Sequence, residues 1–168
     1  MKTKKIILEI IKIILVVMAI LIMPILYSLR IGITEGQSMY PFIDNSEGST
    51  KILLLKNSIL SPAYDRGDIV AIDASDEIED EDNQIVKRII GLEGDHVEIK
   101  NNKVYINGEI YEEPYLDGMD YTMSDLDVYV PYEYVFCMGD NRDRSADSRV
   151  YGCFRYDDIV GKYIMTLD

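Results

Sequence analysis

Apolar and polar positions divide the chain into two unequal parts. No charged residue occurs from Ile13 to Leu29, and residues 6–12 before them are mostly apolar. At about 1.5 Å per residue, a helix of roughly 25 such residues crosses the hydrocarbon core of a membrane, which is about 30 Å thick. We therefore predict a basic tip followed by one transmembrane helix within residues 1–30.

In the remaining part, residues 31–168, short apolar runs replace the long one. Gly, Pro, Asn and Asp separate runs rich in Val, Ile, Leu and Tyr at 51–60, 67–73, 84–92, 96–100, 103–108, 133–140 and 158–167. Segment 97–109 has Asn-rich turn signals and is typical of a hairpin. No long stretch with a 3.6-residue period follows residue 30. We predict a mainly β fold, in which an antiparallel β-sheet domain follows one N-terminal transmembrane helix.

The charges around the apolar segment predict its orientation. The lysines on its N-terminal side are Lys2, Lys4, Lys5 and Lys12, and Arg30 follows its C-terminal end. Under the positive-inside rule, the N-terminus lies in the cytoplasm and residues 31–168 lie on the outer face of the cell membrane. A cleaved signal peptide, the alternative, has an apolar region of about 7–15 residues and an A-x-A-like site. The longer apolar region and the sequence YSLRIGITEG after it favour a retained anchor.

Acidic residues dominate the second part of the chain. The formal net charge is −13 at pH 7, and Glu9 is the one acidic residue among the first thirty, so 29 of the 30 Asp and Glu residues follow. Such a surface repels phosphate backbones, and no nucleic-acid partner is expected. The densest acidic run, residues 73–82, is typical of a solvated loop. Calcium binding is the alternative, but the run lacks the central Gly and closing Glu of an EF-hand loop.

Ser38, in the segment GQSMYPF (36–42), is a candidate nucleophile that needs a base. The chain contains no S-x-x-K or K-T-G signature, and no G-x-S-x-G surrounds this serine. A triad based on histidine would depend on one residue, because His96 is the only histidine. His96 begins the run 96–100, where we expect a structural or surface role.

Lys87 is the remaining candidate base. It precedes Arg88 inside an otherwise apolar run, and strand alternation would send one of the two side chains inward and the other outward. Burial beside another cation lowers the pKa of a lysine from about 10.4, and the neutral amine can then accept the proton of a serine hydroxyl. A lysine at a strand edge or in an ion pair is the alternative.

Small polar residues alternate with Asp and Arg in GDNRDRSADSRVYG, residues 139–152. Ser145 could orient a lysine amine. Asp147 and Arg149 could form a charge-assisted pair that fixes this segment. A surface loop held by its own salt bridges is the alternative.

The chain offers little for metals or cofactors. Its two cysteines, Cys137 and Cys153, form no C-x-x-C pair and stand in apolar surroundings, so we favour buried free thiols over a disulfide. A single histidine removes most His-rich zinc sites. No metal and no cofactor are therefore predicted.

Together these segments resemble the type I signal peptidase family of Ser/Lys endopeptidases. Four segments match the family's motifs in order, behind an N-terminal anchor: GQSMYPF matches S-M-x-P, RGDIVAI (66–72) matches R-G-D-I-V, KRIIGLEGD (87–95) matches the lysine box, and MGDNRDRSADSRVYG (138–152) matches the last box. The short insertion at about 97–136 resembles the compact, Gram-positive form of the family.

The resemblance implies a role for each candidate residue. Ser38 is the implied nucleophile, its backbone N–H is the implied oxyanion donor, and Lys87 is the implied general base. Ser145 positions the lysine amine in this scheme. Asp147 and Arg149 support the site.

The implied activity is removal of signal peptides from exported preproteins, after small residues, by a membrane-bound enzyme. The bound segment would extend the sheet as a strand, with shallow apolar pockets lined by Met39, Ile85 and Val86. Gly36 stands where some members have a serine as a second oxyanion donor. The implied partners are preproteins and membrane lipid, and a monomer is expected. Alternatives are a peptidase dedicated to one surface or pilus substrate, a self-cleaving Ser/Lys repressor, which would need a DNA-binding domain, and an inactive relative that acts as an assembly factor.

Overall fold

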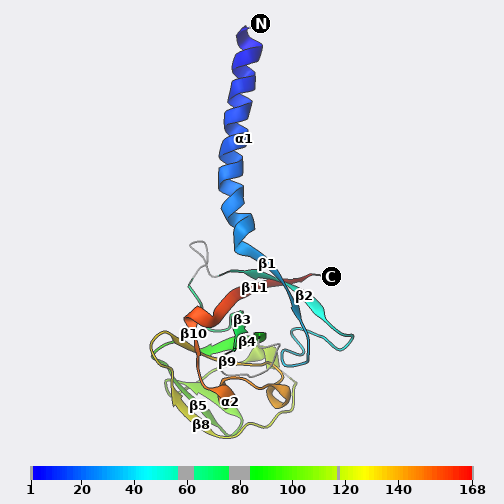
Figure 1. Cartoon of the computed structure of the whole chain (residues 1–168). Helices are drawn as coiled ribbons and strands as arrows, with labels where there is room; N and C mark the ends of the chain where they lie inside the picture. The colour runs from blue at the N-terminus through cyan, green and yellow to red at the C-terminus, as the bar shows by residue number, and fades with distance from the viewer. Residues whose placement is uncertain (1, 57–62, 76–83, 117, 168) are drawn as a thin grey trace.

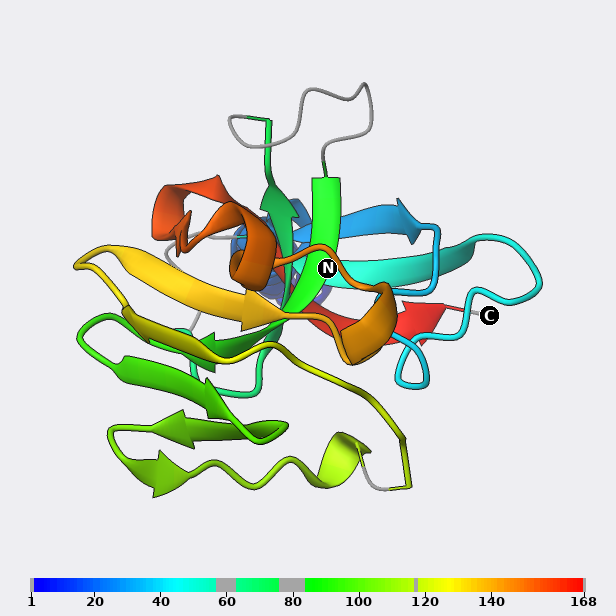
Figure 2. The ribbon, with the colours of Figure 1, turned by 90° about the horizontal axis from the view of Figure 1, so that it is seen from below.

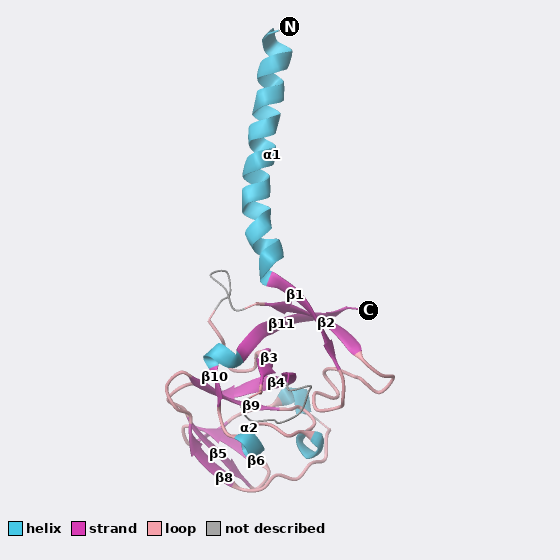
Figure 3. Ribbon diagram, in the orientation of Figure 1, coloured by secondary structure: helices cyan, strands magenta, loops and turns pink. Residues whose placement is uncertain are grey.

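The computed structural model describes residues 2–56, 63–75, 84–116 and 118–167, whose elements are drawn in Figures 1 and 3. One long helix projects from a domain that contains two β-sheets. The end of the predicted run 51–60 and most of the acidic run 73–82 lie outside the described residues. The predicted fold, mainly antiparallel β-sheet behind one apolar helix, is confirmed.

Helix α1 spans Lys2–Ser28. Its segment Ile6–Ser28 is long and apolar enough to cross a membrane, and its most apolar stretch is not buried against the domain. A helix with apolar side chains on every side needs apolar surroundings, which the interior of a bilayer supplies. At its last turn, Ser28 Oγ donates to the Pro24 carbonyl at 2.9 Å.

The larger sheet contains seven strands in the order β1-β2-β11-β3-β4-β9-β10, and each neighbouring pair is antiparallel. Its strands are β1 (Leu29–Thr34), β2 (Thr50–Leu55), β3 (Ile69–Asp73), β4 (Gln84–Gly91), β9 (Tyr134–Met138), β10 (Phe154–Arg155) and β11 (Ile159–Leu167). Because β1 begins at the residue after α1 ends, no loop separates the helix from the sheet.

The smaller sheet contains four antiparallel strands in the order β7-β6-β5-β8. Its strands are β5 (His96–Lys100), β6 (Lys103–Ile106), β7 (Glu109–Ile110) and β8 (Leu126–Tyr129). Asn101 and Asn102 connect β5 to β6 with φ of 51° and 61°, the positive values that a two-residue type I′ turn requires. The smaller sheet lies at the end of the domain opposite α1, and Figure 2 shows it to one side of the larger sheet.

Short helices complete the domain. They are η1 (Pro114–Leu116), η2 (Arg142–Arg144), α2 (Ser148–Tyr151) and η3 (Tyr156–Asp158). Both η2 and α2 lie in the polar segment 139–152, where the sequence predicted a dense hydrogen-bonding set.

Strand β4 is covered on both faces, and one prediction was therefore wrong. Either Lys87 or Arg88 was expected to point outward, but Lys87 is 3% exposed and Arg88 is 7% exposed. Their side chains project to opposite faces of the strand, where Lys87 contacts Ser38 and Arg88 contacts Asp140. Alternation separates the two cations, but protein covers both sides of the sheet at this point.

The two sheets pack together through one apolar cluster. It contains Ile90, Phe136 and Met138 from the larger sheet and Val97, Ile99, Val104 and Ile106 from the smaller one. At Gly91 in β4, a Cβ atom would lie 2.6 Å from Val97 Cγ2 and 3.0 Å from Val130 Cγ2. The close approach of the sheets therefore depends on the missing side chain at this position.

We expect Gly91→Ala to destabilise the fold, because the added methyl group would overlap Val97 and Val130. Overpacking of this kind lowers the free energy of unfolding by about 1–3 kcal/mol. Thermal unfolding of the full chain in detergent micelles should show a lower melting temperature. Gly32→Ala is the control, because its Cβ would lie no closer than 3.3 Å to another side chain, the nearest atom being Leu54 Cδ1. Equal melting temperatures for Gly91→Ala and wild type would contradict the expectation.

Candidate active site

Ser38 and Lys87 come together although they lie 49 residues apart in the sequence. Ser38 lies in the turn that follows β1, and Lys87 projects from β4 with its side chain buried. The distance from Lys87 Nζ to Ser38 Oγ is 2.9 Å, and Nζ also donates to the Val86 carbonyl at 3.0 Å. A buried amine in contact with a serine hydroxyl is suited to accept the proton of that hydroxyl.

Burial changes the ionisation of Lys87. Removal from water lowers the pKa of its amine from the ordinary 10.5 to about 8, against the opposing effects of Asp147 and Cys137 and with a further lowering by Arg149. With a pKa of about 8, roughly one tenth of the amines are neutral at pH 7. The neutral form is the one that can act as a base, so the site is poised close to neutral pH.

Asp147 organises the segment behind Lys87. This carboxylate is fully buried and accepts hydrogen bonds from Ser145 Oγ at 2.7 Å, from the Gly139 N–H at 2.9 Å and from two nitrogens of Arg149 at 2.8 Å each. Burial raises the pKa of Asp147, but the hydrogen bonds and charge of Arg149 outweigh burial and hold that pKa below its ordinary value. The predicted pair between Asp147 and Arg149 is thus present. Ser145, predicted to orient the lysine amine, donates to Asp147, and its role toward the amine stays a prediction.

The turn that contains Ser38 is held against the segment that follows β9. The Asn141 N–H donates to the Ser38 carbonyl at 3.0 Å, and Asn45 Nδ2 donates to the Gly36 carbonyl at 2.8 Å. A Cβ atom at Gly139 would lie 2.5 Å from the Ser38 carbonyl oxygen and would overlap the Ser145 side chain. Glycine at position 139 therefore lets the two segments come this close.

A second buried ion pair, which the sequence did not single out, lies on the other face of β4. Arg88 donates through Nε and Nη2 to the two oxygens of Asp140, at 2.8 and 2.6 Å. Its guanidinium also lies 4.0 Å from the ring centre of Tyr115 and 5.1 Å from that of Phe42. The sequence offered one signal for this pair, the adjacent cations Lys87 and Arg88 in an apolar run, because a buried arginine needs an acidic partner.

A groove of about 720 Å³ opens beside Ser38 and Lys87. Residues 30–34 of β1 and 84–87 of β4 form two of its walls, so the predicted pocket residues Ile85 and Val86 line it. Met39, the third predicted pocket residue, is 3% exposed and packs in the core. Within the described residues, β1 pairs only with β2, and residues 84–87 pair only with β3. Among the described strands, both walls therefore present an edge that no further strand covers.

The other polar candidates have the surroundings expected for structural residues. His96 lies on β5 with Nε2 2.8 Å from Asp127 Oδ1. Both cysteines are free thiols, and Cys137 is buried. Burial raises the pKa of the Cys137 thiol well above its ordinary value and that of Cys153 to about 11. These thiols stay protonated at neutral pH.

Comparison with known proteins identifies the family. A family model described as signal peptidase, peptidase S26, matches residues 7–167. The chain belongs to the S26 signal peptidase family. It is 40% identical over 160 residues to signal peptidase I S of Bacillus subtilis, which covers 89% of this chain and 81% of the relative. Signal peptidase I U of the same species is 37% identical over 166 residues, covering 90% of this chain and 84% of the relative.

The fold of this S26 peptidase also resembles that of a solved relative. The crystal structure of a signal peptidase I from Enterococcus faecalis V583 has a TM-score of 0.53 and 30% sequence identity, covering 64% of this chain and 100% of that chain. The resemblance to type I signal peptidases is confirmed, and the protein is a serine endopeptidase that cleaves signal peptides. Its apolar N-terminal helix is consistent with the membrane anchoring of such an enzyme.

The lowered pKa of Lys87 predicts how the S26 peptidase responds to pH. The protonated amine cannot act as a base, so the rate should be low below the pKa and high above it. We expect kcat/KM to rise about tenfold between pH 7 and 9, with an inflection near 8. Initial rates of signal-peptide cleavage over this range measure the profile, and a flat profile would contradict Lys87 as the base.

Gly139→Ala should impair activity as well as stability, because the added methyl group would overlap the Ser38 carbonyl oxygen and the Ser145 side chain. A misplacement of about 1 Å can lower a rate by about 10²-fold, so we expect a loss of kcat of that order. Gly91→Ala is a matched control, because its methyl group would overlap residues between the sheets. Rates are compared at equal concentrations of folded protein. A wild-type kcat in Gly139→Ala would show that this contact does not position the nucleophile.

Proposed function

We propose that the protein removes signal peptides by nucleophilic attack of Ser38, with Lys87 as general base. The observation that supports this most directly is the 2.9 Å contact between Ser38 Oγ and the buried Lys87 Nζ. Asp147 and Arg149 support the site by balancing each other's charge beside the lysine. Ser145 is a positioning residue that acts through Asp147.

The reaction begins when the neutral Lys87 amine takes the proton of the Ser38 hydroxyl and Oγ bonds to the scissile carbonyl carbon. The Ser38 backbone N–H stabilises the carbonyl oxygen as negative charge develops on it. The Lys87 ammonium then gives its proton to the leaving amine, and the peptide bond breaks. In deacylation, Lys87 takes a proton from water, whose oxygen attacks the ester carbon, and the proton returns to Ser38 Oγ as the ester breaks.

The substrate binds in the groove as an extended strand between β1 and β4. The uncovered strand edges on both walls support this proposal, because an added strand can pair with such edges. Apolar side chains, among them Ile52, Leu54, Ile85 and Val86, line the groove beside Ser38. A shallow apolar lining suits small substrate side chains, as expected for cleavage after small residues.

Helix α1 anchors the enzyme in the cell membrane, with its N-terminus in the cytoplasm and residues 31–168 on the outer face. The lysines that precede the apolar segment support this orientation. Attachment of enzyme and preprotein to one membrane raises their effective concentration. We expect a monomer, because the proposed groups of the site all come from one chain, and no cofactor takes part in the proposed steps.

Ser38→Ala and Lys87→Ala should each lower kcat/KM for a model preprotein by about 10³-fold or more, because each variant removes one member of the pair. Ser46→Ala and Lys103→Ala are matched controls, since they remove exposed side chains of the same types. Gel assays with sequencing of the product N-terminus measure the rate and the cleaved bond.

Wild-type rates in either Ser38→Ala or Lys87→Ala would rule out the proposed pair. The same assay with several precursors separates a general signal peptidase from a dedicated one. Cleavage of a single precursor among many would favour the dedicated peptidase.

A further inference from the structure

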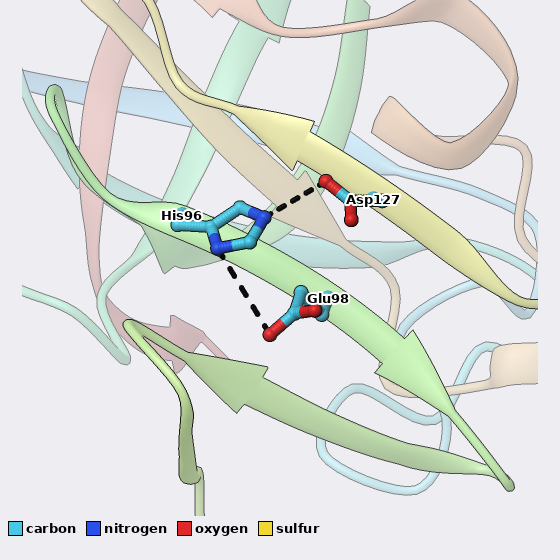
Figure 4. A group of neighbouring side chains, drawn as sticks. All are labelled: His96, Glu98 and Asp127. Atoms are coloured by element: carbon cyan, nitrogen blue, oxygen red, sulfur yellow. Dashed lines mark hydrogen bonds and ion pairs between the residues drawn. The ribbon is translucent and has the colours of Figure 1, made fainter.

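His96, Glu98 and Asp127 lie together on one face of the smaller sheet, as Figure 4 shows. His96 and Glu98 are two residues apart on β5, so their side chains project from the same face. Asp127 lies on β8 directly opposite Glu98 in the register. The alternating residues Val97 and Ile99 point to the core. Two paired strands thus hold three side chains of metal-ligand type side by side.

The three side chains are close enough to share one ligand. One potential ligand atom from each residue lies within 4.8 Å of those from the other two. His96 Nε2 is 2.8 Å from Asp127 Oδ1, and Nδ1 is 3.9 Å from Glu98 Oε2. The Tyr129 ring stacks on the imidazole, with centres 4.1 Å apart and planes at 7°. Because the stack covers a face of the imidazole, the ring is oriented while its nitrogens remain directed at the carboxylates.

We propose that His96, Glu98 and Asp127 form a binding site for one divalent cation of the zinc type. An imidazole nitrogen with two carboxylate oxygens is a ligand set that zinc accepts, whereas calcium and magnesium prefer oxygen ligands. A single histidine argues against a His-rich site, as the sequence indicated, but not against a site with one imidazole.

Small side-chain movements would make room for an ion of this size. Ligand atoms about 2.1 Å from a tetrahedral zinc ion lie about 3.4 Å from one another. His96 Nε2 and Asp127 Oδ1 lie 2.8 Å apart and would separate slightly to admit the ion, whereas the 3.9 Å contact of Glu98 is with the other ring nitrogen, Nδ1. Zinc would replace the proton between His96 Nε2 and Asp127, and a rotation of Glu98 would bring in the third ligand. Asp127 is free to adjust, since its side chain is 65% exposed.

The negative charge around the site favours a cation, and the Lys100 ammonium would compete with that cation for Glu98. Two carboxylates flank one imidazole in a chain whose net charge is −13, which raises the local concentration of cations. Lys100 pairs with Glu98 Oε1, and the other oxygen of Glu98 faces His96. The Lys100 side chain is largely exposed, so its ammonium can withdraw into water when the metal binds.

Zinc bound here would join β5 to β8. Ser38 and Lys87 lie at the larger sheet, so the metal would stabilise the smaller sheet and take no part in peptide cleavage. An ion that binds only the folded state raises the melting temperature as its concentration increases. The proposal is therefore independent of the proposed mechanism of cleavage.

Calorimetric titration of the untagged full chain, in detergent micelles, with zinc chloride tests the site. We expect one equivalent to bind, and His96→Ala and Asp127→Asn each to weaken the affinity at least about tenfold. Asp125→Asn, which removes an exposed carboxylate near Asp127, is the matched control and should bind like wild type. Lys100→Met should bind zinc more tightly, because it removes the competing ammonium, and a misfolded variant would not gain affinity.

Three results would overturn the proposal. The first is the absence of zinc binding to wild type at millimolar concentration. The second is equal affinity in wild type and Asp127→Asn, which would place the ion elsewhere on the acidic surface. The third is tighter binding of calcium than of zinc, which would contradict an imidazole ligand.

Discussion

The proposed chemistry depends on the Lys87 amine, which is kept from water and, among the residues that the structure describes, forms no ion pair of its own. Asp147 is the charge that favours the protonated form of Lys87, yet its two oxygens already accept hydrogen bonds from Arg149, Ser145 and Gly139. A carboxylate satisfied in this way attracts the lysine less, and desolvation prevails. Arg149 thus affects the pKa of Lys87 through Asp147. The segment 139–152 supplies the hydrogen bonds that the Asp147 carboxylate accepts.

Strand β4 is covered on both faces around Lys87 and Arg88. On one face of β4 the amine meets the turn that contains Ser38, and on the other the Arg88–Asp140 pair is enclosed by the rings of Phe42 and Tyr115. Phe42 follows Ser38 closely in sequence, so the same short segment contacts both faces. The same packing therefore positions the Lys87 amine and lowers its pKa.

The local features could be predicted from the sequence, and the interactions between distant segments could not. The apolar helix, the strands and the Asn101–Asn102 turn follow from runs of neighbouring residues, and the pairing of Asp147 with Arg149 follows from two residues in one segment. The burial of Arg88 depends on Asp140, 52 residues away. Met39 was expected in the groove but packs in the core with Ile43 and Ile52. Each difference arises because the position of the side chain depends on residues that are distant in the sequence.

The junction between α1 and β1 has a geometric consequence. Ser28 ends the helix, Leu29 begins the strand, and residues 30–34 of that strand form a wall of the groove. Helix α1 therefore continues directly into the strand that forms the groove wall. This direct connection sets the distance between the apolar helix and the groove. For a substrate whose own helix lies in the same bilayer, we expect the height of a peptide bond above the hydrocarbon to decide, together with the side chains around it, which bond reaches Ser38.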